Sequence, residues 1–261
     1  MTVPAHPAVQ SARDFDAAWV KQHLQEERAS ASLLSEIREA VFGAQDGLTS
    51  VLAVVSTVGG ATHEPFPVLI AGLAATLAGV FSMAAGEYMS SKSQREIFDA
   101  QIASEATEVD ERPAEAEAEV AFMLQEEGLE REAAFRVARE LAGSRAVLLK
   151  TMVEKELGLV VEDGGGNAVR GAVVMGASFG LAALVPLLPY LFLPVSVAVY
   201  VSVALTGLAL FVMGVVKSRW TQRHWLPSGL EIFLLGAVAG IAGYFFGTVL
   251  PGLLGVAGVP G

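Results

Sequence analysis

The sequence predicts an all-α membrane protein with five transmembrane helices and an acidic helical insert between the second and the third. Of its 261 residues, 53% are hydrophobic and only 17% are charged, and the mean hydropathy is +0.51, which is too apolar for an ordinary soluble domain. A spanning helix needs about 20 mostly apolar residues. Five stretches of suitable length lie between the charged segments: 41–62, 66–89, 168–192, 195–216 and 229–250.

A soluble all-α protein with long buried helices is the alternative class. Helices of that kind usually carry a polar stripe along one face. Residues 195–216 have no such stripe, so the pattern favours the membrane class.

The segment before the first span, residues 1–40, is expected to be a disordered start followed by an amphipathic helix. This helix would dock on the membrane surface through its apolar members, which are Trp19, Leu24, Leu33, Leu34 and Ile37. Acidic and basic residues are mixed along the segment, so no basic region leads into an apolar one. No cleaved signal is therefore expected.

The first two spans, within residues 41–90, are expected to form a hairpin because the turn at 62–67 contains two prolines. The insert occupies residues 91–166. Its first part, 92–109, can continue the helix of the second span into water, and Pro113 then breaks that helix.

Two further helical stretches follow in the insert. Residues 114–127 form the first, which Gly128 ends, and 130–157 form the second, with a weak point at Gly143. Residues 167–261 then hold the third, fourth and fifth spans.

The distribution of charge predicts the orientation. Of 28 acidic residues, 18 lie between Ser91 and Gly166, and the net charge is −11, so nucleic acid is not an expected partner. The loops at 62–67 and 190–195 contain no lysine or arginine. The other span ends carry Lys21, Arg28, Arg38, Lys92, Arg95, Lys217, Arg219 and Arg223. Because basic residues favour the cytoplasm, the N-terminus and the insert are predicted to be cytoplasmic.

Three side chains in the first two spans could bind a cation. Asp46 lies inside an otherwise apolar span, where a charge costs about 2.5–3.5 kcal/mol, which favours a cation ligand over a hydrated position near the cytoplasmic mouth. Met83 and Glu87 are four residues apart and share a helix face, so a thioether and a carboxylate could line one passage. The alternatives are that Met83 fills the core and that Glu87 reaches to the interface.

The insert offers a second group of possible ligands. Three pairs have the spacing of one helix face: Glu105 with Glu108, Glu115 with Glu119, and Met152 with Glu156. Carboxylates converging from separate helices would make an oxygen site for a divalent cation, and a thioether would shift its preference toward transition metals. The alternative is a solvated acidic surface.

Several other chemistries are not supported. The chain has no cysteine, which excludes disulfides, thiolate metal sites and cysteine nucleophiles. Its four histidines form no i, i+4 pair or Glu-x-x-His element, and no EF-hand, Walker loop or nucleophile elbow occurs. An enzyme is therefore not expected, no cofactor is expected, and active transport would have to use an ion gradient.

Three glycine pairs in the spans have the spacing of close helix contacts. They are Gly43 with Gly47, Gly176 with Gly180, and Gly236 with Gly240. Such pairs permit tight packing within or between subunits, so they are a weak indication of a dimer.

Taken together, the motifs resemble the vacuolar iron transporter family, including its plant nodulin-like and bacterial members. The resemblance covers nearly everything after residue 36. Its most specific parts are Asp46-Gly47-Leu48-Thr49, Ser82-Met83-Ala84-Ala85-Gly86-Glu87-Tyr88, Ser91-x-Ser93-Gln94-Arg95-Glu96 and Glu156-Leu157-Gly158-Leu159.

The resemblance implies a homodimer with five spans per subunit, a path between the subunits lined by the first two spans, and a cytoplasmic three-helix metal-binding insert. It implies proton-coupled export of metal from the cytosol. Asp46 and Met83 match the family's intramembrane metal residues. The residues that match the ligands of the insert are Glu105, Glu108, Glu119, Met152 and Glu156.

Two positions depart from the family pattern. Ala116 stands where the site of the insert usually has a glutamate, and either Glu115 or Glu117 could substitute for it. Ala75 stands where some members carry a glutamate two turns before the methionine, which would give Glu87 a larger part in the membrane.

The functional hypothesis is export of Fe²⁺ or Mn²⁺ in exchange for protons, with the lipid bilayer and a second copy of the chain as further partners. Oxygen ligands with one thioether accept both metals, so the sequence does not separate them. The alternative is a membrane-anchored metal buffer or sensor without transport. A bacterial inner membrane is the expected location, because the chain is compact and rich in alanine.

Overall fold

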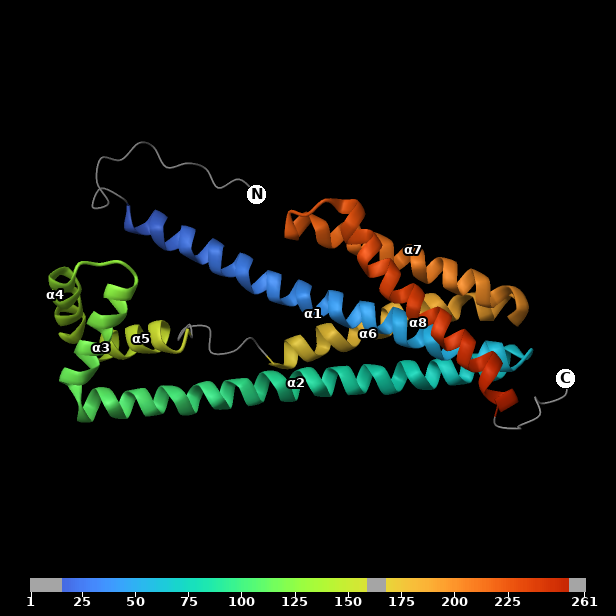
Figure 1. The fold of residues 1–261 in the computed structure, drawn as a ribbon, viewed down its shortest axis with the longest axis horizontal. Helices are drawn as coiled ribbons and strands as arrows, with labels where there is room; N and C mark the ends of the chain where they lie inside the picture. The colour runs from blue at the N-terminus through green and yellow to red at the C-terminus, as the bar shows by residue number, and fades with distance from the viewer. Residues whose placement is uncertain (1–15, 159–167, 254–261) are drawn as a thin grey trace. The chain divides into compact units, whose positions relative to one another are not determined.

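The computed structural model describes residues 16–158 and 168–253, and over these ranges it contains helices and no strand. The described chain has eight helices (Figure 1), which confirms the all-α prediction. They are α1 (Ala17–Ala61), α2 (Pro65–Glu111), α3 (Pro113–Glu126), α4 (Arg131–Ala142), α5 (Arg145–Glu156), α6 (Ala168–Phe192), α7 (Val195–Thr221) and α8 (Trp225–Leu253).

The described residues divide into two compact units. The first unit, here called the membrane unit, contains the residues up to Ala84 and those from Val173 onward. The second, here called the insert unit, runs from Ala85 to Ala172 and includes the last part of α2.

Five segments of the described helices are long and apolar enough to cross a membrane, as the sequence predicts. They are Glu36–Ala61 in α1, α2, α6, α7 and Trp225–Phe246 in α8. The side of the membrane on which the insert lies stays a prediction.

The predicted amphipathic helix and the first span form one continuous helix, α1. Asp16 caps its start by accepting a hydrogen bond from the backbone N–H of Ala18 at 3.0 Å. No glycine or proline occurs between Ala17 and Phe42, so nothing in the sequence breaks the helix before the span. The predicted disorder of the first residues lies outside the described part of the chain.

The helix boundaries in the insert follow its glycines and prolines. α2 continues from the second span to Glu111, because no proline follows Pro67 until Pro113, which is the first residue of α3. After α3, Gly128 has φ +104°, a backbone conformation that favours glycine. Gly143 lies between α4 and α5, at the predicted weak point.

The glycine pairs of the spans pack within this chain. A Cβ added at Gly43 or Gly47 would meet the backbone of α6 at Met175 and Phe179. Gly176 and Gly180 likewise approach α2 at Val80, while Gly236 and Gly240 approach Leu210 of α7 and Leu52 of α1. These pairs therefore do not support the predicted dimer, because each pair makes a contact within one chain.

The insert unit has its own hydrophobic core. α3 contributes Ala116, Val120 and Leu124, which are four residues apart and so lie on one face of the helix. The other helices add Val109 from α2, Ala134 and Ala138 from α4, and Leu148 and Met152 from α5. This core fixes the rotation of α3, and with it the direction of the glutamates on its other faces.

Candidate metal centre

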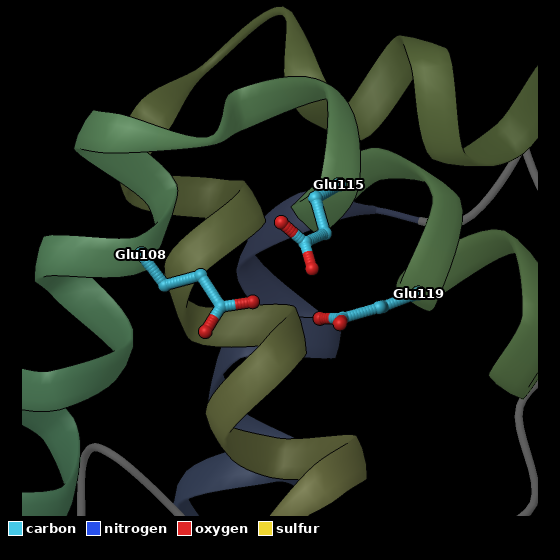
Figure 2. Close-up of side chains that lie close together, drawn as sticks. All are labelled: Glu108, Glu115 and Glu119. Carbon is cyan, nitrogen blue, oxygen red and sulfur yellow. The ribbon is translucent and has the colours of Figure 1, made fainter.

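Three of the predicted carboxylates meet at the junction of α2 and α3. Glu108 lies near the end of α2, and Glu115 and Glu119 lie one turn apart on α3. One carboxylate oxygen from each lies within 4.8 Å of the other two. Figure 2 shows the three carboxylates pointing toward one another. Separations of this size allow three oxygens to contact one divalent cation after small side-chain rotations.

Glu105 and Glu156 add negative charge to the same place. Burial is the largest cause that raises the pKa of Glu105, followed by the charges of Glu156 on α5 and Glu108 on α2. One carboxylate oxygen of Glu105, Oε2, is buried and has no hydrogen-bond partner among the described residues. Burial also raises the pKa of Glu119, and Glu108 raises it further by its charge and by a shared hydrogen bond. Five predicted carboxylates from α2, α3 and α5 thus influence one another.

The structure distinguishes the two candidates for the glutamate missing at Ala116. Ala116 is fully buried in the core of the insert unit. Glu117 points to another neighbour, since its Oε1 lies 3.5 Å from Nε of Arg139 on α4. Glu115 is the one that lies with Glu108 and Glu119.

Arg112 lies between the glutamates, and the sequence analysis did not identify it. Its guanidinium is 3.2 Å from a carboxylate oxygen of Glu108 and 2.9 Å from one of Glu115. Glu115 is the largest cause that raises the pKa of Arg112, and Glu108 follows. The spacing could have revealed it, because Arg112 is four residues after one glutamate and three before the other. Arg112 therefore neutralises part of the cluster when no metal is bound.

Met152 differs from the glutamates in its surroundings. It is fully buried in the core of the insert unit, together with Val109 and Ala116. Glu156, one turn later on α5, is exposed. A role of Met152 as a thioether ligand stays a prediction.

The predicted ligands within the spans, unlike the glutamates of the insert, do not form a cluster among the described residues. Asp46 is partly exposed on α1, and its side chain has no hydrogen bond or ion pair with any described residue. Its backbone carbonyl accepts a hydrogen bond from the hydroxyl of Ser50 at 2.5 Å. Met83 is partly buried against the core of the membrane unit, as is Ala75. This placement agrees with the alternative that Met83 fills the core.

Glu87 belongs to the insert unit, whereas Asp46 and Met83 belong to the membrane unit. Its carboxylate accepts a hydrogen bond from the hydroxyl of Ser91 at 2.7 Å. A joint site with Asp46 therefore stays a prediction.

The raised pKa values predict how pH changes the stability of the protein without metal. Because folding raises the pKa of Glu105 and Glu119, their stabilising contribution is fully present below the ordinary glutamate pKa of about 4.3 and is lost as pH rises through the raised values. Thermal unfolding of the metal-free protein from about pH 7.5 down to about pH 5 should therefore show a rising Tm. The contribution of Asp110 to stability depends on pH in the opposite direction, because its hydrogen bond with Arg145 lowers its pKa. This contribution is lost only at pH values below the ordinary aspartate range.

The double variant Glu105→Gln and Glu119→Gln is the control for this pH effect. It removes both titrating groups, so its Tm should change less with pH than that of the parent. If Tm changed equally with pH in the parent and in the variant, Glu105 and Glu119 would not be the groups responsible for the pH effect.

Replacing Arg112 with glutamine should increase the affinity of the cluster for divalent cations. The change removes a positive charge that is bonded to two candidate ligands, and we expect a gain of roughly threefold to tenfold because the pairs are partly exposed to solvent. Mn²⁺ titration of the purified protein by calorimetry would measure it. Arg136→Gln on α4 is the matched control. If Arg112→Gln bound Mn²⁺ more weakly than this control, Arg112 would not compete with the cation for the glutamates.

Comparisons with known proteins agree with the motifs. The model of the VIT family matches residues 37–248. A protein named vacuolar iron transporter from Centaurea cyanus is 34% identical over 209 residues, covering 80% of this chain and 85% of the relative. Vacuolar iron transporter 2 of Oryza sativa subsp. japonica is 32% identical over 237 residues, covering 86% and 96%. The vacuolar iron transporter of Plasmodium falciparum is 27% identical over 226 residues, covering 82% of each. The family resemblance drawn from the sequence is confirmed.

Proposed function

Because this chain belongs to the VIT family, we propose that it exports Fe²⁺ or Mn²⁺ from the cytosol across a membrane in exchange for protons. Relatives that are about a third identical over most of their length are named as iron transporters, which supports metal as the cargo. The five apolar helices supply the spans that a transporter requires.

The observation that carries this proposal is the carboxylate cluster of Glu108, Glu115 and Glu119. Their oxygens are hard ligands with the close spacing that a divalent cation needs. Glu105 and Glu156 would complete a multidentate site, and Met152 would supply the softer ligand that favours Fe²⁺ over Ca²⁺. We assign this site the capture of metal from the cytosol.

Asp46 is the proposed ligand within the membrane. Its carboxylate has no hydrogen-bond or ion-pair partner among the described residues, and in an apolar helix it needs either a proton or a cation to be neutral. Competition between the two at this carboxylate would couple metal movement to proton movement in the opposite direction. Met83 and Glu87 are the proposed neighbours along the path.

A homodimer is part of the proposal, with the first two spans lining the path between the subunits. The support in this chain is the outer face of α2, where large apolar side chains recur at helical spacing without burial: Phe66, Ile70, Leu73, Leu77 and Phe81. The proposed membrane is a bacterial inner membrane, with the N-terminus and the insert in the cytoplasm.

The second candidate function is a membrane-anchored metal buffer or sensor. One observation favours it: three carboxylates of the insert lie close together, whereas Asp46 belongs to no group of three or more His, Cys, Asp or Glu side chains within the described residues. In this case the insert would bind metal without passing it across the membrane.

Metal flux into sealed proteoliposomes distinguishes the two functions. With an acidic lumen and Fe²⁺, Mn²⁺ or Ca²⁺ added outside, we expect uptake of Fe²⁺ or Mn²⁺ together with a rise in lumenal pH, and little uptake of Ca²⁺. Protein-free vesicles under the same gradient give the background. Metal bound by the protein without uptake above this background would favour the buffer or sensor.

A further inference from the structure

A groove between α1 and α7 lies entirely within the membrane unit and takes no part in the proposed transport site. It has a volume of about 390 Å³, and Figure 1 shows the two helices that form it. Its α1 wall consists of residues one helical turn apart, among them Leu34, Arg38 and Phe42. Lys217 and Trp220 from the last turns of α7 close the other side.

The groove lies at the ends of two segments that are long and apolar enough to cross a membrane. The apolar segment of α1 begins at Glu36, and that of α7 ends at Thr221, so both walls pass from apolar to polar sequence here. Trp220 is 48% exposed, a position typical of the tryptophans that anchor spans at the level of lipid headgroups. Leu34 and Phe42 are more than half exposed in the same groove, so an apolar part of a ligand could contact them.

Two positively charged side chains line this groove, Arg38 and Lys217. Neither Arg38 nor Lys217 forms an ion pair with any carboxylate in the described residues. Two cations beside apolar walls complement a ligand that carries an anionic head and an apolar tail.

We propose that this groove binds an anionic phospholipid, with its phosphate between Arg38 and Lys217 and its acyl chain along Leu34 and Phe42. The two cations supply charge-assisted hydrogen bonds to the phosphate oxygens. The apolar wall distinguishes a lipid from free phosphate, which would gain nothing from it. A bound lipid then fastens the start of the first span to the end of the fourth.

Quenching of Trp220 fluorescence by brominated lipids tests this proposal. The chain has three tryptophans, so Trp19→Phe with Trp225→Phe leaves Trp220 as the only reporter. The full-length protein in mixed nanodiscs is compared with brominated phosphatidylglycerol and with brominated phosphatidylcholine at equal fractions. We expect an apparent affinity roughly tenfold higher for phosphatidylglycerol, given the attraction of two basic residues.

Variants assign this preference to the groove. Arg38→Gln with Lys217→Gln should lower the ratio of the two affinities to about one, whereas Arg38→Lys with Lys217→Arg should keep it. Lys21→Gln with Arg219→Gln is the matched control, because it removes the same charge from α1 and α7 outside the groove. This control should keep the preference, and elution profiles and circular dichroism show which variants fold.

Three outcomes would overturn the proposal. Equal quenching of the parent by both lipids would mean ordinary contact with the bilayer. Quenching by neither lipid would mean that another part of the protein or a second copy covers Trp220. In the third outcome, millimolar inorganic phosphate abolishes the preference for phosphatidylglycerol, whereas sulfate at equal ionic strength has no effect. The groove would then be a site for free phosphate.

Discussion

Replacing Asp46 with alanine should reduce Fe²⁺ uptake by proteoliposomes to the level of protein-free vesicles, a fall of about a hundredfold or more from the parent. The reason is that Asp46 is the one carboxylate proposed to hold both metal and proton within the first span. Asp46→Asn tests the charge alone, because it keeps the size and polarity of the side chain. We expect this variant to lose uptake and the accompanying change in lumenal pH together.

Two controls separate a loss of transport from a loss of folding. Glu231→Gln removes another carboxylate from an apolar helix, α8, and should transport at the rate of the parent. Mn²⁺ affinity, measured by calorimetry, should be unchanged in Asp46→Ala if the insert remains folded. Uptake by Asp46→Ala at the rate of the parent would remove Asp46 from the mechanism.

Replacing Glu108 and Glu119 together with glutamine should weaken the binding of Mn²⁺ or Fe²⁺ by about a hundredfold, because two charged ligands of one site become neutral. One carboxylate oxygen of each lies within 4.8 Å of the other, so the two groups act at the same place. Calorimetric titration of the full-length protein measures the loss. Uptake at low metal concentration should fall as well, whereas uptake at saturating metal should fall less, if capture is the role of the insert.

Glu117→Gln with Glu132→Gln is the matched pair for this experiment. Both residues lie in the insert unit, and Glu117 pairs with Arg139 instead of joining the cluster. The pair removes the same charge, so it corrects for general electrostatic attraction. If both double variants weakened binding equally, the insert would attract metal only through its overall charge.

Features of the fold that depend on local sequence were predictable. The five spans follow from composition, and the helix ends at Pro113, Gly128 and Gly143 follow from residues that interrupt helices. The joining of the amphipathic helix to the first span was not predicted, although the absence of glycine and proline between Ala17 and Phe42 allows it.

The candidate site was predictable only in part. Helical spacing identified the glutamate pairs, but it could not show that α2, α3 and α5 bring their side chains to one place, since this depends on how the core packs. The burial of Ala116 sets the rotation of α3, which places Glu115 and not Glu117 beside Glu108 and Glu119. Arg112 was not predicted because an arginine is not a cation ligand, and its role here is to compete with a cation for Glu108 and Glu115.

The proposed ligands come from three separate helices, and this arrangement has a consequence for the stability of the protein in the cell. If an ion is held by α2, α3 and α5 as proposed, it binds only while these helices are packed together, so it would act as a reversible cross-link that favours the folded insert. At a free metal concentration about a hundred times the dissociation constant, this linkage contributes about 2.7 kcal/mol. We expect proteases to degrade the chain faster in cells starved of metal, so that the abundance of the protein follows the supply of its own cargo.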